Sequence, residues 1–319
     1  MSDRVERFKV TVGVEFAGKR LDQALAVLFP DFSRSRLQQW VKAGLVTIDG
    51  HPCKQRDKVA GGEEVRLEAR LEDQVECRPQ AIPLNLIYED RDILVVDKPA
   101  GLVVHPAAGN PDGTLQNGLL GFDPDMIRLP RAGIVHRLDK DTSGLLVVAR
   151  TTGAHRSLVE QLQAREIKRE YRAVAVGVLT AGGRIDQPIG RHPVHRTKMA
   201  VVPSGKPAVT HFRVLERFRA HSYLRVNLET GRTHQIRVHL AHVRAPLVGD
   251  PLYGGRLRMP ADISSELADT LRGFGRQALH AHRLGLRHPV NGDWLEWVSQ
   301  VPEDMQHLLD VLRLDMNHG

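Results

Sequence analysis

The amino-acid sequence predicts an α+β protein in which a mixed, largely antiparallel sheet flanked by helices follows a small N-terminal domain. The chain has 319 residues, which suffice for one large domain and one small one. Runs of β-branched residues outnumber helical segments and lack the regular strand–helix alternation of a doubly wound sheet. Between about residues 70 and 86 an acidic, proline-bearing stretch breaks every periodicity and is typical of a linker, which we place at residues 76–86. We therefore expect domains at residues 1–75 and 87–319.

The small domain should begin with two short helices. Apolar residues recur at helical spacing within residues 19–29, and Pro30 ends that run. Ser33 is a suitable N-cap for a second helix through Ala43, and Gly44 follows at the position where helices commonly end. We expect both helices to be amphipathic.

Short strands should complete this domain. Residues 45–48 and 52–54 have strand character, and the turn dipeptide Asp49-Gly50 joins them. Residues 64–68 alternate apolar and charged side chains and should form the closing strand. The whole unit fits within about 60 residues.

The larger domain should be rich in strands. These are expected at residues 92–98, 172–176, 208–214 and 223–228. Helices are expected only near residues 114–121, 152–165, 233–242 and 302–313. This pattern favours a sheet covered by helices over an alternating fold.

Composition narrows the class of protein. The formal charge of +7 and isoelectric point near 9.6 favour a polyanionic partner, although many basic proteins bind nothing charged. Cys53 and Cys77 lack zinc-ligand spacing and fit a reducing compartment. No apolar signal core or long apolar stretch is present. We therefore expect a cytoplasmic protein without membrane segments.

The polar loop at residues 133–144 contains the strongest candidate for chemistry. Asp139 lies among His136, Arg137 and Lys140, directly before an apolar strand. Nearby cations favour the charged form of a carboxyl group, which suits a nucleophile better than a proton donor. Asp139 or Asp141 could instead simply cap a turn, because Asp in such loops is usually structural.

Three motifs resemble those of the RluA-type pseudouridine synthases, which isomerise uridine in structured RNA. Residues 136–144 are similar to the catalytic loop of that family. Residues 168–173 resemble its Lys-x-Tyr strand, and residues 229–239 resemble its Gly-Arg-x-His-Gln-Ile-Arg helix entry. The shared region covers about residues 85–300, and the three motifs occur in the expected order.

This resemblance implies particular site residues. Asp139 would be the catalytic carboxylate, either attacking the sugar or base or stabilising a glycal-like intermediate. Tyr171 would lie against the uracil ring, although a strand Tyr is more often plain core. Arg237 would pair with Asp139, so its loss should cost activity more than folding; otherwise it binds phosphate or lies on the helix surface.

The implied chemistry requires neither a metal nor a cofactor. Uridine isomerisation involves no redox change and no outside atom. His136, His234 and His239 lack carboxylate or thiolate partners at the spacing that zinc requires. The glycine-bearing segment at residues 101–113 also lacks the spacing of a phosphate-binding loop, so nucleotide binding has little support.

RNA-binding residues are expected in both domains. Arg137 could fill the space left by a flipped base or simply contact phosphate, and His136 would have an orienting or phosphate-side role. The small domain resembles the αL, S-four-type RNA-binding domain, which implies that Arg34, Arg36 and Lys42 contact RNA. Alternatively, this module docks on protein.

The resemblance also indicates a substrate. The overall layout, with residues 98–106, is similar to the branch of the family that acts on the large ribosomal subunit. This implies 23S ribosomal RNA, or a large-subunit assembly particle, as partner, with the helix 69 stem-loop as target and a contribution to ribosome biogenesis. Other 23S uridines, or a non-enzymatic assembly clamp, are the alternatives.

Overall fold

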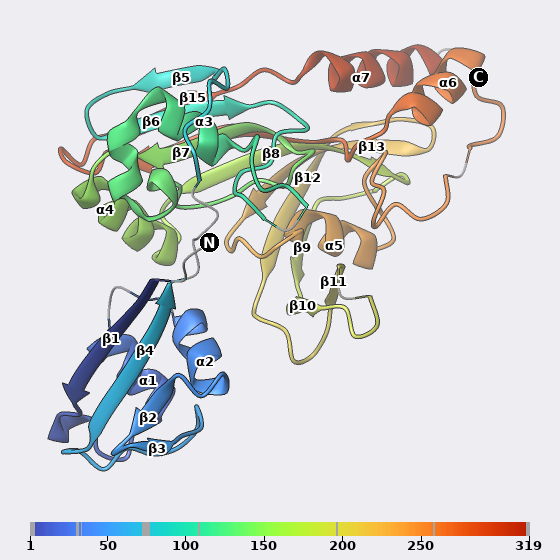
Figure 1. Cartoon of the computed structure of the whole chain (residues 1–319). Coiled ribbons are helices and arrows are strands. Elements are labelled where there is room, and N and C mark those ends of the chain that lie inside the picture. The colour runs from blue at the N-terminus through green and yellow to red at the C-terminus, as the bar shows by residue number, and fades with distance from the viewer. Residues whose placement is uncertain are drawn as a thin grey trace. The chain divides into compact units, whose positions relative to one another are not determined.

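A computed structural model describes residues 4–29, 32, 34–71, 77–107, 109–195, 197–257 and 259–316 (Figure 1). The chain divides into two compact units, Met1–Glu76 and Cys77–Gly319. Each unit has its own apolar core, so each is described by itself.

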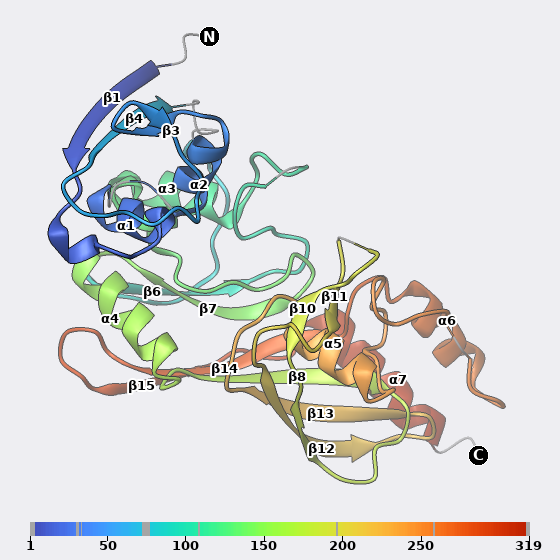
Figure 2. The same ribbon diagram turned by 90° about the horizontal axis from the view of Figure 1, so that it is seen from below.

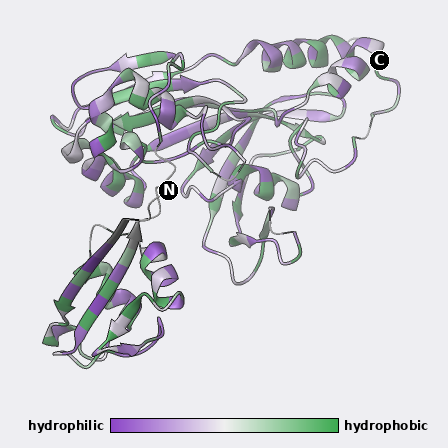
Figure 3. Cartoon of the chain, viewed as in Figure 1, coloured by the Kyte–Doolittle hydropathy of each residue, from purple (hydrophilic) through white to green (hydrophobic). Residues whose placement is uncertain are grey.

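The first unit is a four-stranded antiparallel sheet with two α-helices. In sheet order its strands are β1 (Arg4–Thr11), β4 (Glu64–Leu71), β2 (Val46–Ile48) and β3 (His51–Pro52). Its helical elements are η1 (Val14–Phe16), α1 (Leu21–Leu28) and α2 (Arg34–Lys42). Hydrophilic and hydrophobic bands alternate along these strands in Figure 3, as expected for a sheet with one face on the core.

The turn chemistry of this unit agrees with its sequence. Asp49 and Gly50 have φ values of 48° and 79°, the pair of left-handed residues that a two-residue type I′ hairpin requires. Ile48 then pairs with His51 across the turn. The predicted helices and strands are confirmed to within a few residues, whereas β1 was not predicted. The proposed N-cap, Ser33, lies outside the described residues.

The second unit is built on one large sheet (Figures 1 and 2). In sheet order its strands are β5 (Leu86–Glu89), β6 (Ile93–Lys98), β7 (Ser143–Ala149), β14 (Leu279–Arg287), β8 (Lys168–Val176), β13 (His221–Leu228), β12 (Val209–Arg217) and β9 (Gly183–Asp186). β15 (Trp294–Val298) also pairs with β14, and β10 (Ile189–Arg191) pairs with β11 (Met199–Val201). Among these described strands, only β7 and β14 pair in parallel. This confirms the predicted α+β fold.

Helices cover both faces of that sheet. They are α3 (Leu115–Phe122), η2 (Pro124–Arg128), η3 (Pro130–Gly133), α4 (Thr152–Gln163), α5 (Gln235–His242), α6 (Ser265–Gly273) and α7 (Glu303–Met316). One face packs against α3 and α5, and the other packs against α4 at one end and α6 with α7 at the other. Both faces are therefore apolar, as in the run Leu145–Ala149.

The segment expected to be a linker differs from that expectation. From Cys77 onward its residues belong to the second unit, where Cys77 and Leu84 pack against the core. The Asn117 amide donates a hydrogen bond to the Arg78 carbonyl, which ties the segment to α3. Proline and charged residues interrupt the periodicity of a packed segment as well as that of a flexible linker. Composition alone therefore could not distinguish a packed segment from a linker.

None of the helices formed by the described residues is long and apolar enough to cross a membrane.

Two histidines are buried in the large sheet, one on β13 and one on β14. His221 and His280 are 3% and 1% exposed, and burial lowers the pKa of each to about 4. The Ser143 hydroxyl lies 3.0 Å from Nδ1 of His280. Both rings are therefore neutral in the folded protein near neutral pH.

The folded protein should lose stability on mild acidification. Below pH 6.5 the unfolded chain takes up protons that the folded chain excludes until about pH 4, so stability falls as pH falls through this window. Each ring should cost about 2 kcal/mol at pH 5. Denaturant unfolding at pH 7 and pH 5 would measure this.

Because burial also lowers the pKa of His136 and His105, His280→Asn should remove only the contribution of one ring, about 2 kcal/mol between pH 7 and pH 5, whereas the exposed His51→Asn should keep the wild-type slope. An equal slope in wild type and His280→Asn would contradict the assignment.

Candidate active site

The loop that bears Asp139 connects η3 to β7 on the sheet face covered by α3 and α5. Gly144, at the start of β7, has a φ of 111°, a left-handed value that favours glycine. A Cβ atom there would lie 2.3 Å from the Ala281 carbonyl oxygen. Glycine therefore permits the close parallel pairing of β7 and β14 beside the loop.

A buried lysine also forms hydrogen bonds to the backbone of this loop. Lys98, which is 0% exposed, ends β6, and its Nζ donates hydrogen bonds to the carbonyls of Pro99, Leu102 and Lys140 at 2.8 to 2.9 Å. Lys140 directly follows Asp139. Burial lowers the pKa of Lys98 to about 8, and the nearby Asp141 and Asp139 carboxylates oppose this shift. Three carbonyl acceptors match the three donors of an ammonium group.

Asp139 is paired with a guanidinium from α5. Nη1 of Arg237 donates to Oδ2 of Asp139 at 2.9 Å, while Nε and Nη2 of Arg237 donate to the two oxygens of Asp250 at 2.7 and 2.8 Å. The Asp250 side chain is fully buried, whereas that of Asp139 remains 16% exposed. The bidentate pair fixes the guanidinium plane, so a single N–H group is directed at Asp139.

Electrostatics stabilise this arrangement. Burial alone would lower the pKa of Arg237, but the hydrogen bonds and charges of Asp250 and Asp139 raise it above the ordinary value. Burial would likewise raise the pKa of Asp250, and its pairing with Arg237 lowers it. The guanidinium carbon also lies 5.1 Å from the Tyr253 ring centroid. Arg237 and Asp250 therefore remain charged at neutral pH.

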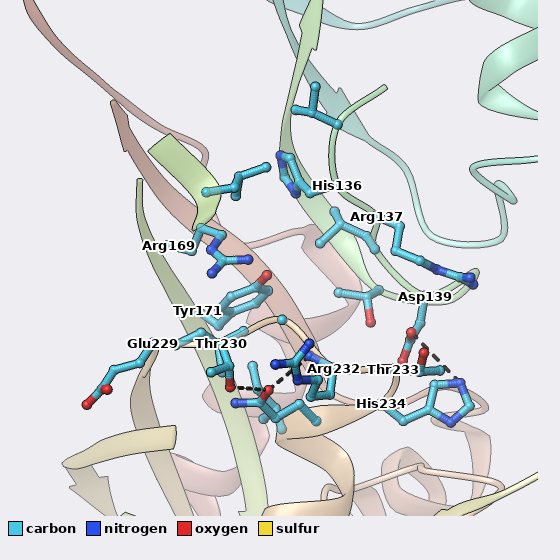
Figure 4. A pocket seen from close by; sticks show the side chains of 18 of the residues that line it. His136, Arg137, Asp139, Arg169, Tyr171, Glu229, Thr230, Arg232, Thr233 and His234 are labelled. Atoms are coloured by element: carbon cyan, nitrogen blue, oxygen red, sulfur yellow. Dashed lines mark hydrogen bonds and ion pairs between the residues drawn. The ribbon is translucent and has the colours of Figure 1, made fainter. Parts of the chain in front are cut away.

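His234 adopts a strained backbone conformation at the start of α5. Its φ of 56° is left-handed, which is uncommon outside glycine and costs about 1 kcal/mol or more. The Tyr253 hydroxyl lies 2.8 Å from its Nδ1, and its Nε2 lies 3.9 Å from Oδ1 of Asp139 (Figure 4). Burial lowers the pKa of His234, with Asp139 opposing. A neutral ring that accepts at Nδ1 presents its Nε2 proton toward Asp139.

These groups line an open cavity of about 620 Å³. Tyr171, on β8, is 6% exposed and forms part of the cavity wall together with Asp139 and Arg237. Burial raises the pKa of the Tyr171 phenol, so the group stays protonated at neutral pH. The structure thus brings together the three residues that the sequence singled out, from the loop, β8 and α5.

The predicted RNA contacts of the loop have different surroundings. Arg137 is exposed and lines the cavity, where it can meet phosphate. His136 also lines the cavity, but its Nε2 accepts a hydrogen bond from the backbone N–H of Val147 at 3.2 Å. Burial, aided by Arg169, lowers its pKa to about 3. His136 is therefore a neutral anchor for the loop rather than a cation for phosphate.

The RNA-binding candidates of the first unit lie on α2. Lys42 is exposed in the last turn of the helix. The guanidinium of Arg36 lies over the Trp40 ring, 5.6 Å from its centroid. Arg34 begins the helix, but its side chain lies outside the described residues. Within this unit, the described candidates share one short helix.

Three polar residues of the site were not predicted. Lys98 and Asp250 act on the site from positions remote in sequence, and nothing in the local pattern indicated their contacts. Arg169 lines the cavity two residues before Tyr171. The period-two alternation of a strand could have identified it, because residues two apart share a face. Lys168, which carried the sequence resemblance, is instead exposed.

One cluster of metal-ligand type occurs among the described residues. Ligand atoms of Asp90, Asp92 and His288 lie within 4.8 Å of one another. Asp90 already accepts hydrogen bonds from Tyr88, from His288 and from backbone N–H groups. These bonds account for the cluster as a loop-stabilising network.

Comparison with known proteins matches both units. A family model described as RNA pseudouridylate synthase covers residues 92–242, and one described as S4 domain covers residues 19–65. The ribosomal large subunit pseudouridine synthase D of Pseudomonas aeruginosa is 59% identical over 315 residues, which span 99% of this chain and 98% of that protein. The Escherichia coli K12 protein of the same name is 56% identical over 316 residues, which span 99% and 97%.

Solved structures give a similar result for the larger unit. The human RNA pseudouridylate synthase domain containing 4 is 27% identical, with a TM-score of 0.56 over 72% of this chain and 93% of that chain. The human RNA pseudouridylate synthase domain containing 1 is 25% identical, with a TM-score of 0.53 over 73% and 96%.

Replacing Arg237 by Met should impair folding as well as activity. The sequence led us to expect mainly a loss of activity, but the change would leave Asp250 buried and unpaired at a cost of about 3 kcal/mol or more. Denaturant unfolding and an assay of pseudouridine formation would measure the two effects separately.

The double variant Arg237→Met with Asp250→Asn should recover part of that stability, because it removes the unpaired charge, but it should remain inactive. Full stability in the single variant, or wild-type turnover in the double variant, would refute this account.

Lys98→Met should slow turnover by about 10-fold or more while leaving RNA affinity nearly unchanged, because it releases the loop without touching the cavity. In the wild type, turnover should fall above about pH 8 as the ammonium loses a proton and one donor. Single-turnover rates from pH 6.5 to 9.5 would test both expectations.

The matched control is Lys140→Met, since this exposed side chain lies in the same loop and only its backbone carbonyl contacts Lys98. It should keep wild-type stability and the alkaline decline. The same alkaline decline in Lys98→Met would show that another group titrates.

Proposed function

Because this chain belongs to the RNA pseudouridylate synthase family, we propose that it converts specific uridines of 23S ribosomal RNA to pseudouridine, with Asp139 as the catalytic carboxylate. The target that we propose is the helix 69 stem-loop. The coarser statement, that the protein is an RNA pseudouridine synthase, follows from family membership and from the identity to the curated relatives over almost the full chain.

One observation carries the assignment of Asp139. Its carboxylate lies 2.9 Å from the Arg237 guanidinium and faces the same cavity as Tyr171. A half-buried carboxylate that a guanidinium pairs with and orients, with space for a nucleoside in front of it, meets the requirements of covalent or electrostatic catalysis. Asp141, two residues further on, does not line this cavity.

The reaction is an internal exchange of bonds. The bond from ribose C1′ to ring N1 breaks, and its electron pair goes to the base, while Asp139 stabilises or captures the sugar. The base turns within the cavity, and C5 forms the new bond to C1′. C5 then loses its proton and N1 ends with one, so that no atom is gained or lost. The cavity retains the detached base between these steps.

Tyr171 is proposed to pack against the uracil ring. Its phenol is buried and protonated, so it offers an apolar face and a neutral hydroxyl rather than a charge. The exposed Arg137 at the cavity edge is proposed to contact the RNA, either by filling the space of the flipped base or by pairing with phosphate.

Two features support ribosomal RNA as the substrate. The relatives whose names include the large ribosomal subunit align over nearly their whole length, with 56% to 59% identity. The first unit matches an RNA-binding family and bears the exposed Lys42 on α2. A basic chain with formal charge +7 should bind a polyanion by counterion release.

The proposal can be tested in cells that lack the protein. Pseudouridine would be mapped in their 23S ribosomal RNA by carbodiimide chemistry and mass spectrometry. Expression of the wild type should restore pseudouridine in helix 69, and Asp139→Asn should not, with turnover reduced more than about 100-fold. RNA affinity of the variant should be nearly unchanged, because phosphate contacts elsewhere supply it.

Asp141→Asn is the matched control and should restore modification. Modification at other 23S uridines would correct the target only. An unmodified pattern with stalled subunits would support a non-enzymatic assembly clamp, and a tenth of normal turnover in Asp139→Asn would remove Asp139 from its role.

A further inference from the structure

We infer that Arg169 binds a carbonyl oxygen of the target uracil and stabilises the negative charge that the base acquires during the reaction. This inference rests on the proposed function, and it adds a base-recognition residue beside Tyr171 on the same wall of the cavity.

Arg169 and Tyr171 extend from the same face of β8 into the cavity (Figure 4). Residues two apart in a strand share a face, which places the guanidinium next to the phenol. Arg169 is close enough to Tyr171 and to His136 for its charge to act on the pKa of both groups. It is only 9% exposed, so it lies at the depth of the base-binding Tyr171.

The guanidinium has no hydrogen-bond acceptor or ion-pair partner among the described residues. Its Nε is buried and has no hydrogen-bond acceptor. The buried Nε of Arg225 also lacks a hydrogen-bond acceptor, but Arg225 differs from Arg169 in its charge pairing, because Arg225 and Arg172 both form an ion pair with the Glu170 carboxylate. A buried cation without a partner is costly. An acceptor supplied by a ligand in the cavity would remove that cost.

A glycine makes room for this side chain. A Cβ atom at Gly231 would lie 2.9 Å from Nη1 of Arg169. The φ of Gly231 is not left-handed, so its backbone does not itself require glycine. The Arg169 guanidinium that packs against Gly231 explains why a small residue is present there. The loop after β13 therefore accommodates Arg169 in this position.

The chemistry of uracil supplies the missing acceptor. When the C1′–N1 bond breaks, its electron pair goes to N1 and the negative charge spreads to the O2 and O4 oxygens. If Asp139 instead attacks C6 of the base, the electron pair of the C5–C6 double bond moves through C4 to the O4 oxygen. In either route an N–H group of Arg169 donates to an oxygen whose charge increases in the transition state. The interaction therefore accelerates the reaction rather than merely binding the substrate.

Phosphate is the competing acceptor, and the burial of Arg169 speaks against it. Arg131, Arg137 and Arg165 also line the cavity, and all three are exposed where a nucleic-acid backbone can pass. Arg169 lies deeper, beside the residue proposed to contact the ring. A flipped base inserts further into a protein than its phosphates do. We therefore assign Arg169 to the base.

The first test measures single-turnover rates with ribosomal RNA from cells lacking the protein. Arg169→Met should lower the rate about 100-fold or more, with RNA affinity changed less than about three-fold. Arg225→Met is the matched control, because this arginine lies on the neighbouring strand and faces the opposite side of the sheet. It should retain the wild-type rate.

Gly231→Ala provides a second variant should Arg169→Met fail to fold. The added methyl group meets only the mobile end of the Arg169 side chain, so the fold should persist while the guanidinium moves. Its rate should fall at least about 10-fold. A wild-type rate in a folded Gly231→Ala protein would count against the inference.

The second test identifies the atom that Arg169 contacts. Synthetic RNAs would carry 2-thiouridine or 4-thiouridine at whichever uridine the wild type modifies, or a neutral methylphosphonate beside it. Sulfur accepts hydrogen bonds poorly, so one thio substitution should slow the wild type and have a smaller effect in Arg169→Met. The methylphosphonate should slow both proteins by the same factor.

Each outcome decides the question. Equal thio effects in wild type and variant, a rate for Arg169→Met within three-fold of wild type, or non-additivity with the methylphosphonate would overturn the inference, and the last would assign Arg169 to phosphate. Because the RNA is chosen by wild-type modification, a target other than helix 69 would correct the proposed function without affecting this test.

Discussion

The site depends on one buried guanidinium that two carboxylates share. Arg237 can remain charged in the interior because Asp250 takes two of its N–H groups and Asp139 takes a third. Removing Arg237 or Asp250 leaves a buried charge without its partner, which is far more costly than losing an exposed ion pair, whereas Arg237 keeps its pair with Asp250 if Asp139 is lost. The position of Asp139 is therefore linked to the packing of α5 and to the segment that carries Asp250.

The loop that carries Asp139 is held from several sides. Lys98 binds its backbone from β6, His136 binds β7, and Gly144 allows β14 to approach. These contacts come from elements far apart in sequence, and they leave the carboxylate little freedom. Catalysis by a fixed charge requires this rigidity, because a displacement of about 1 Å can cost two orders of magnitude in rate.

Some polar side chains that line the cavity have hydrogen-bond or ion-pair partners within the protein, and others lack them. His136 is neutral and hydrogen-bonded, and Arg237 is fully paired. Arg169 lacks an acceptor among the described residues, although it is nearly as buried. The buried Nδ1 of His105, which also lines the cavity, has no hydrogen-bond partner among the described residues either. Natural interiors rarely leave such groups unpaired, so these two atoms indicate where a ligand supplies the partner.

The sequence alone determined the α+β class and most helices and strands, because these depend on local spacing and turn chemistry. It singled out Asp139, Tyr171 and Arg237 as candidates only through the resemblance of their motifs to a known family. It did not predict β1, nor that residues 77–86 pack on the second unit. Only the tertiary structure decided the roles of Lys98, Asp250 and Arg169. Their partners are distant in sequence, and whether a polar group is paired depends on how the elements pack around it.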